Sequence, residues 1–126
     1  MEKVLLIDND QPNVDMMAQW LSDEGYKLNK LYSHKGLLGK IYAFNPSIIV
    51  MGITLHGTDG RHFCSLLKTI DRTRHIKIII MSAVLNYYSV DDYEWCADHF
   101  LYEPNTKEKL LNALKGVMQK QANSYH

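Results

Sequence analysis

The stretch PSIIVMGITLHGTDG, residues 46–60, contains the pattern that decides the fold. Its apolar run IIVM, residues 48–51, has no polar interruption, which is typical of a strand buried on both faces of a parallel sheet. Asn45 and Pro46 precede the run, and a loop ending in Asp-Gly follows it. The sequence therefore predicts a central strand with its carboxyl end near Gly52.

Other segments repeat this alternation of strand and helix. Apolar runs, interrupted only at Lys77, predict strands at residues 4–7, 76–81 and 100–101. A weaker alternating pattern predicts an edge strand at residues 27–32. Apolar residues at i, i+3, i+4 and i+7 predict helices at residues 14–21, 37–44, 63–70 and 110–117. Residues 87–97 are the least regular part and are predicted as a short or irregular helix. Right-handed crossovers then give a doubly wound α/β fold with five parallel strands and helices on both faces.

Length and charge limit the classes of function. A chain of 126 residues fits one domain, which we place at residues 1–121 with a loose tail at 122–126. With 14 basic and 14 acidic residues, the formal net charge is zero, so no strong field favours direct binding to nucleic acid or an anionic membrane. Cys64 and Cys96 stand apart in the sequence, without metal-ligand spacing, and are predicted to be buried free thiols. These features favour a cytoplasmic protein.

Polar residues at strand and helix ends carry the remaining local signals. In a doubly wound sheet, a site forms at the carboxyl ends of the central strands, so the residues after each strand are the ones to examine. Asp10 is predicted to cap the first long helix, and Asp59 is predicted as a turn and N-cap residue. Asn105 with Glu108 resembles a capping box for the last helix.

Four strand ends resemble one known family. The stretches VLLIDND (4–10), residues 46–60, IIIMSA (78–83) and ADHFLYEP (97–104) are similar, in order, to the motifs of response-regulator receiver domains. Each motif alone is weak, but four in order across essentially the whole chain are specific. The resemblance implies a flavodoxin-like (βα)5 fold and a role in two-component (phosphorelay) signal transduction.

The family's chemistry assigns roles to these strand ends. An acidic pair and an acceptor Asp hold Mg²⁺, the acceptor attacks a phosphoryl donor, and a hydroxyl residue and a Lys bind the phosphoryl oxygens, so that charge is neutralised in place. By resemblance, Asp8 matches the first acid and Ser82 the hydroxyl residue. Asn9 replaces the second acid, Gly52 occupies the acceptor position, and Glu103 replaces the Lys. Three altered positions favour a natural, degenerate pseudo-receiver over an engineered loss of the acceptor.

Two further roles follow from the resemblance. Phe100 matches the switch aromatic that moves with Ser82, and the backbone carbonyl of Thr54 matches a metal ligand. Because only Asp8 remains among the family's carboxylates, we expect no cofactor and at best weak Mg²⁺ binding, with Asp8 and Thr54 as weak candidate ligands. Glu103 either joins Asp8 as a cation ligand or points to solvent, and we favour solvent. No enzymatic activity is expected.

Aromatic residues concentrate near the end of the sequence. Tyr87, Tyr88, Tyr93 and Tyr102 belong to a segment that forms the usual partner surface in the family, and exposed aromatics often anchor interfaces. We therefore predict a phosphorylation-independent interaction module whose partners are proteins: a histidine kinase, another regulator, or a second copy. The alternative is a receiver still regulated at its pocket by a cation, an anion or non-standard phosphorylation.

Overall fold

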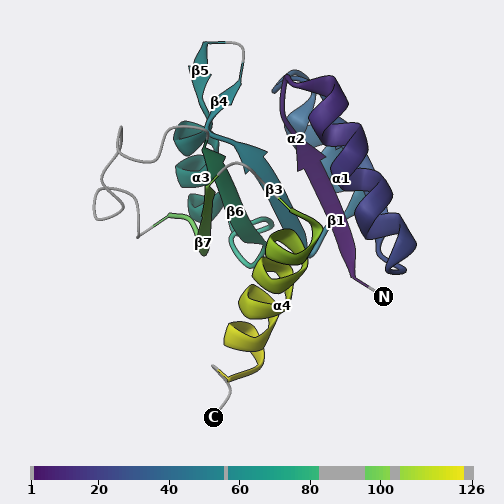
Figure 1. The fold of residues 1–126 in the computed structure, drawn as a ribbon. Helices are drawn as coiled ribbons and strands as arrows, with labels where there is room; N and C mark the ends of the chain where they lie inside the picture. The colour runs from purple at the N-terminus through teal and green to yellow at the C-terminus, as the bar shows by residue number, and fades with distance from the viewer. Residues whose placement is uncertain (1, 56, 83–95, 103–105, 124–126) are drawn as a thin grey trace.

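The computed structural model describes residues 2–55, 57–82, 96–102 and 106–123 (Figure 1). Five parallel strands form one sheet in the order β2-β1-β3-β6-β7, which confirms the predicted flavodoxin-like doubly wound fold. The strands of this sheet are β1 (Lys3–Ile7), β2 (Lys27–Leu31), β3 (Ile48–Gly52), β6 (Lys77–Ser82) and β7 (His99–Tyr102). The described helices are α1 (Gln11–Asp23), α2 (Leu37–Phe44), α3 (Gly60–Thr69) and α4 (Lys107–Asn123).

Both faces of the sheet are buried, as the continuous apolar runs predict. In β1, Val4 and Leu6 face one apolar cluster with α1 and α4, while Leu5 and Ile7 face a second cluster with α2 and α3. Figure 1 shows the same layering, with α1 and α4 on one side of the sheet and α2 on the other. A strand packed on both sides needs apolar residues at consecutive positions, because successive side chains point to opposite faces.

Helix ends follow local capping chemistry. Asp10 caps α1 as predicted, since its carboxylate accepts the Asn13 backbone N–H at 3.2 Å. At the start of α4, the Thr106 hydroxyl accepts the Lys109 backbone N–H at 3.2 Å. The predicted capping box cannot be compared with the structure, because Asn105 lies outside the described residues. Helix α4 continues to Asn123, so residues 122 and 123 of the predicted tail are helical.

Strand β2 is an edge of the sheet and pairs with β1. Its Lys27 and Lys30 are exposed, which agrees with the predicted partly exposed edge strand. Lys30 forms a 3.0 Å ion pair with Asp15 of α1, and the Tyr32 hydroxyl donates to the same carboxylate at 2.6 Å. The Tyr32 hydrogen bond and then the Lys30 contact hold the pKa of Asp15 below its usual range. These contacts attach α1 to the β2 edge.

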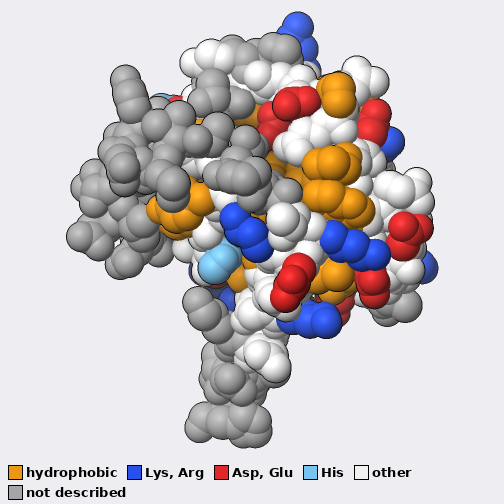
Figure 2. Space-filling model, in the orientation of Figure 1, with side chains coloured by type: hydrophobic (Ala, Val, Ile, Leu, Met, Phe, Trp, Pro, Cys, Tyr) orange, Lys and Arg blue, Asp and Glu red, His pale blue; other side chains and the backbone are white. Residues whose placement is uncertain are grey.

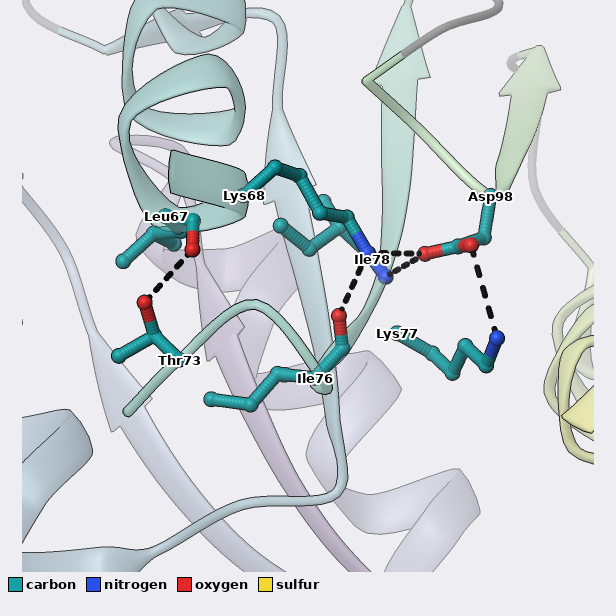
Figure 3. Close-up of polar contacts among 7 residues, drawn as sticks. All are labelled: Leu67, Lys68, Thr73, Ile76, Lys77, Ile78 and Asp98. Atoms are coloured by element: carbon teal, nitrogen blue, oxygen red, sulfur yellow. Dashed lines mark hydrogen bonds and ion pairs between the residues drawn. The ribbon is translucent and has the colours of Figure 1, made fainter. Parts of the chain in front are cut away.

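A polar cluster joins α3, β6 and the entry to β7 (Figure 3). The Asp98 carboxylate accepts the Lys68 ammonium at 2.9 Å and the Ile78 backbone N–H at 2.8 Å. The Lys68 ammonium also donates to the Ile76 carbonyl at 2.8 Å. This one group therefore connects α3 both to the residue before β6 and to the entry of β7. Thr73 is fully buried, and its hydroxyl donates to the Leu67 carbonyl at 2.7 Å. This cluster fixes the end of α3 against the start of β6.

The connection from β3 to α3 differs from the predicted plain loop. Two short strands, β4 (Thr54–Leu55) and β5 (Thr58–Asp59), form an antiparallel hairpin beyond the end of β3 (Figure 1). Gly57 within it has a φ of 79°, a left-handed conformation that favours glycine. The Leu55 side chain is fully buried against the α2–α3 side of the core. Burial of this one side chain anchors the hairpin.

Surface features agree with the balanced composition. On the face in Figure 2, acidic and basic side chains of the described residues are interspersed rather than segregated. Within the described part of the chain, no helix is long and apolar enough to cross a membrane.

Candidate functional site

Three strand ends bring the candidate site residues to one edge of the sheet. The parallel register pairs Ile7 of β1 with Met51 of β3, so Asp8 lies beside Gly52. Gly52 pairs with Met81 of β6, which precedes Ser82. Asp8, Gly52 and Ser82 therefore gather at the carboxyl edge of the three central strands, as the sequence predicts.

The Asp8 carboxylate lies directly over the Cα atom of Gly52. A Cβ atom built on Gly52 would lie 2.8 Å from Oδ2 of Asp8 and 2.9 Å from its Cγ. Separations below 3.0 Å are essentially never seen for a real Cβ atom, so any side chain at position 52 requires Asp8 to move. The Asp10 backbone N–H holds the carboxylate in place by donating to its Oδ1 at 3.1 Å. The space beside Gly52 is thus filled by a neighbouring acid.

Burial governs the protonation of Asp8. Removal from water raises the pKa of this carboxyl, and the nearby charge of Asp10 adds to the increase. Backbone N–H groups of Asp10 and Asn9 oppose the shift without cancelling it. Asp8 is therefore a half-buried acid that holds its proton more tightly than an exposed aspartate does.

Gly60 shapes the same region from the start of α3. A Cβ atom on Gly60 would overlap the backbone oxygen of Gly52, so only glycine fits there. The Gly60 N–H donates to the Ile53 carbonyl at 2.6 Å, and the Ile53 N–H donates to the Met81 carbonyl at 2.8 Å. These bonds hold the N-terminus of α3 tightly against the end of β3. The glycine of the Asp-Gly pair is therefore required by close packing.

Asp59 is the N-cap of α3, as predicted, and it has a partner that sequence reasoning missed. Its carboxylate accepts the Arg61 backbone N–H at 2.9 Å and also forms an ion pair with the Arg61 guanidinium. Partial burial acts to raise the pKa of Asp59, but the hydrogen bonds and charge of Arg61 outweigh it and lower that pKa. Because Arg61 follows two residues later, an Asp-Gly-Arg sequence was the available signal. This pairing supports Asp59 as a structural residue.

The remaining predicted site residues are placed as follows. Ser82 is 4% exposed at the end of β6, and Asn9 is exposed. The backbone of Thr54 belongs to β4, and Glu103 lies outside the described residues. Among the described residues, no three His, Cys, Asp or Glu side chains converge as metal ligands would. Weak Mg²⁺ binding therefore stays a prediction.

A groove beside β7 is lined by Tyr102, which is the one predicted interface residue among the described residues. It has a volume of about 510 Å³ and lies between β7 and α4. Its largely apolar lining includes Phe100, Leu101, Tyr102, Ala113, Gly116 and Val117. Phe100 is partly buried against the α2–α3 side of the core, and Tyr102 is also partly buried. The predicted interface residues Tyr87, Tyr88 and Tyr93 lie outside the described residues.

Comparisons with known proteins agree with this geometry. A CheY-like response regulator receiver domain protein from Methanospirillum hungatei JF-1 is 21% identical, with a TM-score of 0.86 and 98% of each chain covered. A two-component response regulator from Clostridium difficile is 23% identical, with a TM-score of 0.85 and coverage of 96% of this chain and 98% of that chain. Chemotaxis response regulator CheY4 of Vibrio cholerae is 21% identical, with a TM-score of 0.82 and coverage of 93% and 98%.

At these identities the structural likeness establishes the fold, and the family match is independent of it. Residues 4–115, most of the chain, match the response regulator receiver domain. This protein therefore belongs to the response regulator receiver domain family of two-component signalling.

Proposed function

We propose that this receiver domain is a phosphorylation-independent protein-interaction module with no catalytic activity of its own. The observation that carries the proposal is the Asp8 carboxylate packed over Gly52, 2.8 Å from where a Cβ atom would lie. In the family that space belongs to the acceptor side chain. Here it holds a carboxylate that comes from another strand.

The chemistry of phosphoryl transfer supports this view. The resemblance assigns the acceptor position to Gly52, which has no carboxylate to attack a phosphoryl donor. Without a ligand that distinguishes the two states of the switch residues, no phosphorylation event can shift their equilibrium. The domain is then useful in one fixed state.

A fixed state is useful to the cell only through what it binds. The groove between β7 and α4 is the candidate surface, because it is concave, largely apolar and lined by Tyr102. Its partner is a protein of the same signalling pathway, such as a histidine kinase, another regulator or a second copy. By resemblance, the segment of the sequence that contains Tyr87, Tyr88 and Tyr93 belongs to the usual partner surface of the family.

Phosphorylation is tested by intact mass. The protein is incubated with acetyl phosphate and Mg²⁺ beside a receiver domain that retains its acceptor Asp as a positive control. We expect the control to gain one phosphoryl group and this protein to gain none. A stoichiometric gain would refute the proposal and support a receiver regulated at its pocket by non-standard phosphorylation. Tight one-to-one Mg²⁺ binding by calorimetry would instead support regulation by a cation.

The surface is tested by partner recovery from cells of the source organism. We expect Tyr102→Ala to weaken recovery of a specific partner by about 5- to 30-fold, the effect of losing about 1–2 kcal/mol at an interface anchor. Tyr42→Ala is the matched control, because Tyr42 is 39% exposed on α2, on the opposite side of the sheet. Equal recovery with both variants, each with an unchanged melting curve, would place the functional surface elsewhere.

A further inference from the structure

The two cysteines, far apart in sequence, are neighbours in the fold. Cys64 lies in α3, and Cys96 lies shortly before β7. Their side chains are 0% and 2% exposed, both are free thiols, and both belong to the same apolar cluster. The Cys64 thiol is hydrogen bonded to Cys96. The sequence prediction of buried free thiols is confirmed, and the fold places the two thiols beside each other.

A salt bridge aligns the two segments that carry these cysteines. Lys68 lies four residues after Cys64, so both side chains share one face of α3. Asp98 follows Cys96 by two residues, and its carboxylate meets the Lys68 ammonium at 2.9 Å (Figure 3). The Asp98 backbone N–H also donates to the Ile78 carbonyl at 2.8 Å, which fixes this segment to β6. These contacts of Asp98 hold the segment that carries Cys96 against α3 and β6.

We propose that Cys64 and Cys96 are a dithiol modification site that closes to an intramolecular disulfide on reaction with a low-molecular-weight disulfide. One cysteine loses its proton and attacks a sulfur of the small disulfide, which releases one small thiol and leaves a mixed disulfide on the protein. The second cysteine then loses its proton and attacks the protein sulfur of that intermediate, which releases the second small thiol. Both electrons and both protons are accounted for by the two small thiols.

The bond would connect helix α3 covalently to the entry of β7. Strand β7 lines the groove assigned above to partner binding, so oxidation would fix the position of one of its walls. The modification site itself does not depend on that assignment. Burial raises the pKa of the Cys64 thiol, and the neighbouring Cys96 raises it further. Thiolate is therefore scarce at neutral pH, and the reaction should become faster as pH rises.

The test uses the complete protein and glutathione disulfide. After incubation, the protein is denatured in an alkylating reagent and its intact mass is recorded. We expect the loss of two hydrogen atoms, no alkylation, and full reversal by a thiol reductant. A disulfide that closes the loop between Cys64 and Cys96 should also raise the melting temperature by on the order of 10 °C in the absence of reductant. Alkylation of both cysteines, or a stable glutathione adduct or disulfide-linked dimer, would overturn the proposal.

Two variants test whether the salt bridge between Lys68 and Asp98 aligns the two cysteines. Asp98→Asn removes the charge that pairs with Lys68 yet keeps an oxygen for the Ile78 N–H, so we expect it to fold and to oxidise several-fold more slowly. Asp71→Asn is the matched control, because Asp71 forms an exposed ion pair with Arg74. It should oxidise at the wild-type rate. An Asp98→Asn rate equal to that of the control would refute the role of the salt bridge.

Discussion

Placing an acid at position 52, which the resemblance assigns to the phosphoacceptor, is expected to lower the stability of the protein. In Gly52→Asp, the new side chain must displace Asp8, whose Oδ2 lies 2.8 Å from the new Cβ position. Displacement breaks the 3.1 Å hydrogen bond from the Asp10 N–H, which costs about 1 kcal/mol. Two carboxylates about 4 Å apart add roughly 2–4 kcal/mol of repulsion at an effective dielectric constant of 20–40. We expect Gly52→Asp to lower the free energy of unfolding by about 3–5 kcal/mol relative to the wild type.

Gly52→Asn separates the two contributions. It has nearly the same shape as Gly52→Asp without the charge, so the stability difference between the variants reports the repulsion. Urea unfolding at neutral pH and at about pH 4 measures this difference. The dependence of the free energy of unfolding on urea concentration should be the same for both variants.

The sign of the pH dependence follows from linkage. Burial raises the pKa of Asp8, and a second acid raises it further. The folded state then binds more protons than the unfolded state, so the extra instability is present at neutral pH and shrinks as pH falls toward the usual range for aspartate. Equal stability of Gly52→Asp and Gly52→Asn at neutral pH, or transfer of a phosphoryl group from acetyl phosphate to Gly52→Asp, would contradict the expected repulsion between Asp8 and an acid at position 52.

Three further changes test features that position the site. Gly60→Ala should lower the free energy of unfolding by roughly 2–3 kcal/mol, because its methyl group would overlap the Gly52 backbone. Gly116→Ala in α4 should raise the free energy of unfolding by about 0.5–1 kcal/mol, because a Cβ atom there would have no neighbour within 4 Å. Chemical denaturation compares the two variants. Asp8→Asn should flatten the pH dependence of stability and raise stability at neutral relative to acidic pH, because ionisation of Asp8, whose pKa is raised, is unfavourable in the folded protein. Melting temperatures are measured across pH for the variant and the wild type. Coinciding pH profiles of the two proteins would contradict this expectation. Thr73→Val should cost about 1–2 kcal/mol because it removes the buried 2.7 Å hydrogen bond to the Leu67 carbonyl, and a melting curve like the wild type's would show that this bond contributes little.

Sequence patterns predicted the sheet because burial on two faces leaves a strong local signal. The run at residues 48–51 has no polar residue, and each of its side chains is fully buried. Asp10 and Asp59 were also predictable as caps, since capping depends on the next two or three residues. At the start of α4, Asn105 and Thr106 are adjacent polar residues and either can cap a helix, so the sequence alone does not choose between them.

Features that depend on tertiary contact were not predictable in the same way. The position of the Asp8 carboxylate over Gly52 depends on the register of two strands and on one side-chain rotamer. Cys64 and Cys96 gave no spacing signal because the fold, not the chain, makes them neighbours. The hairpin beyond β3 escaped prediction because two-residue strands are too short for a periodic pattern, and Leu55 is its only fully buried apolar anchor among the described residues.

The lysines of β2 bear on how the protein behaves when it is concentrated. An edge strand offers backbone groups to any passing chain and can begin the stacking that ends in a fibril. Adding an identical strand beside β2 would crowd the ammonium groups of Lys27 and Lys30 against their copies and strip them of water, which is unfavourable. We therefore expect this side of the sheet to resist aggregation without help from a chaperone or a covering subunit.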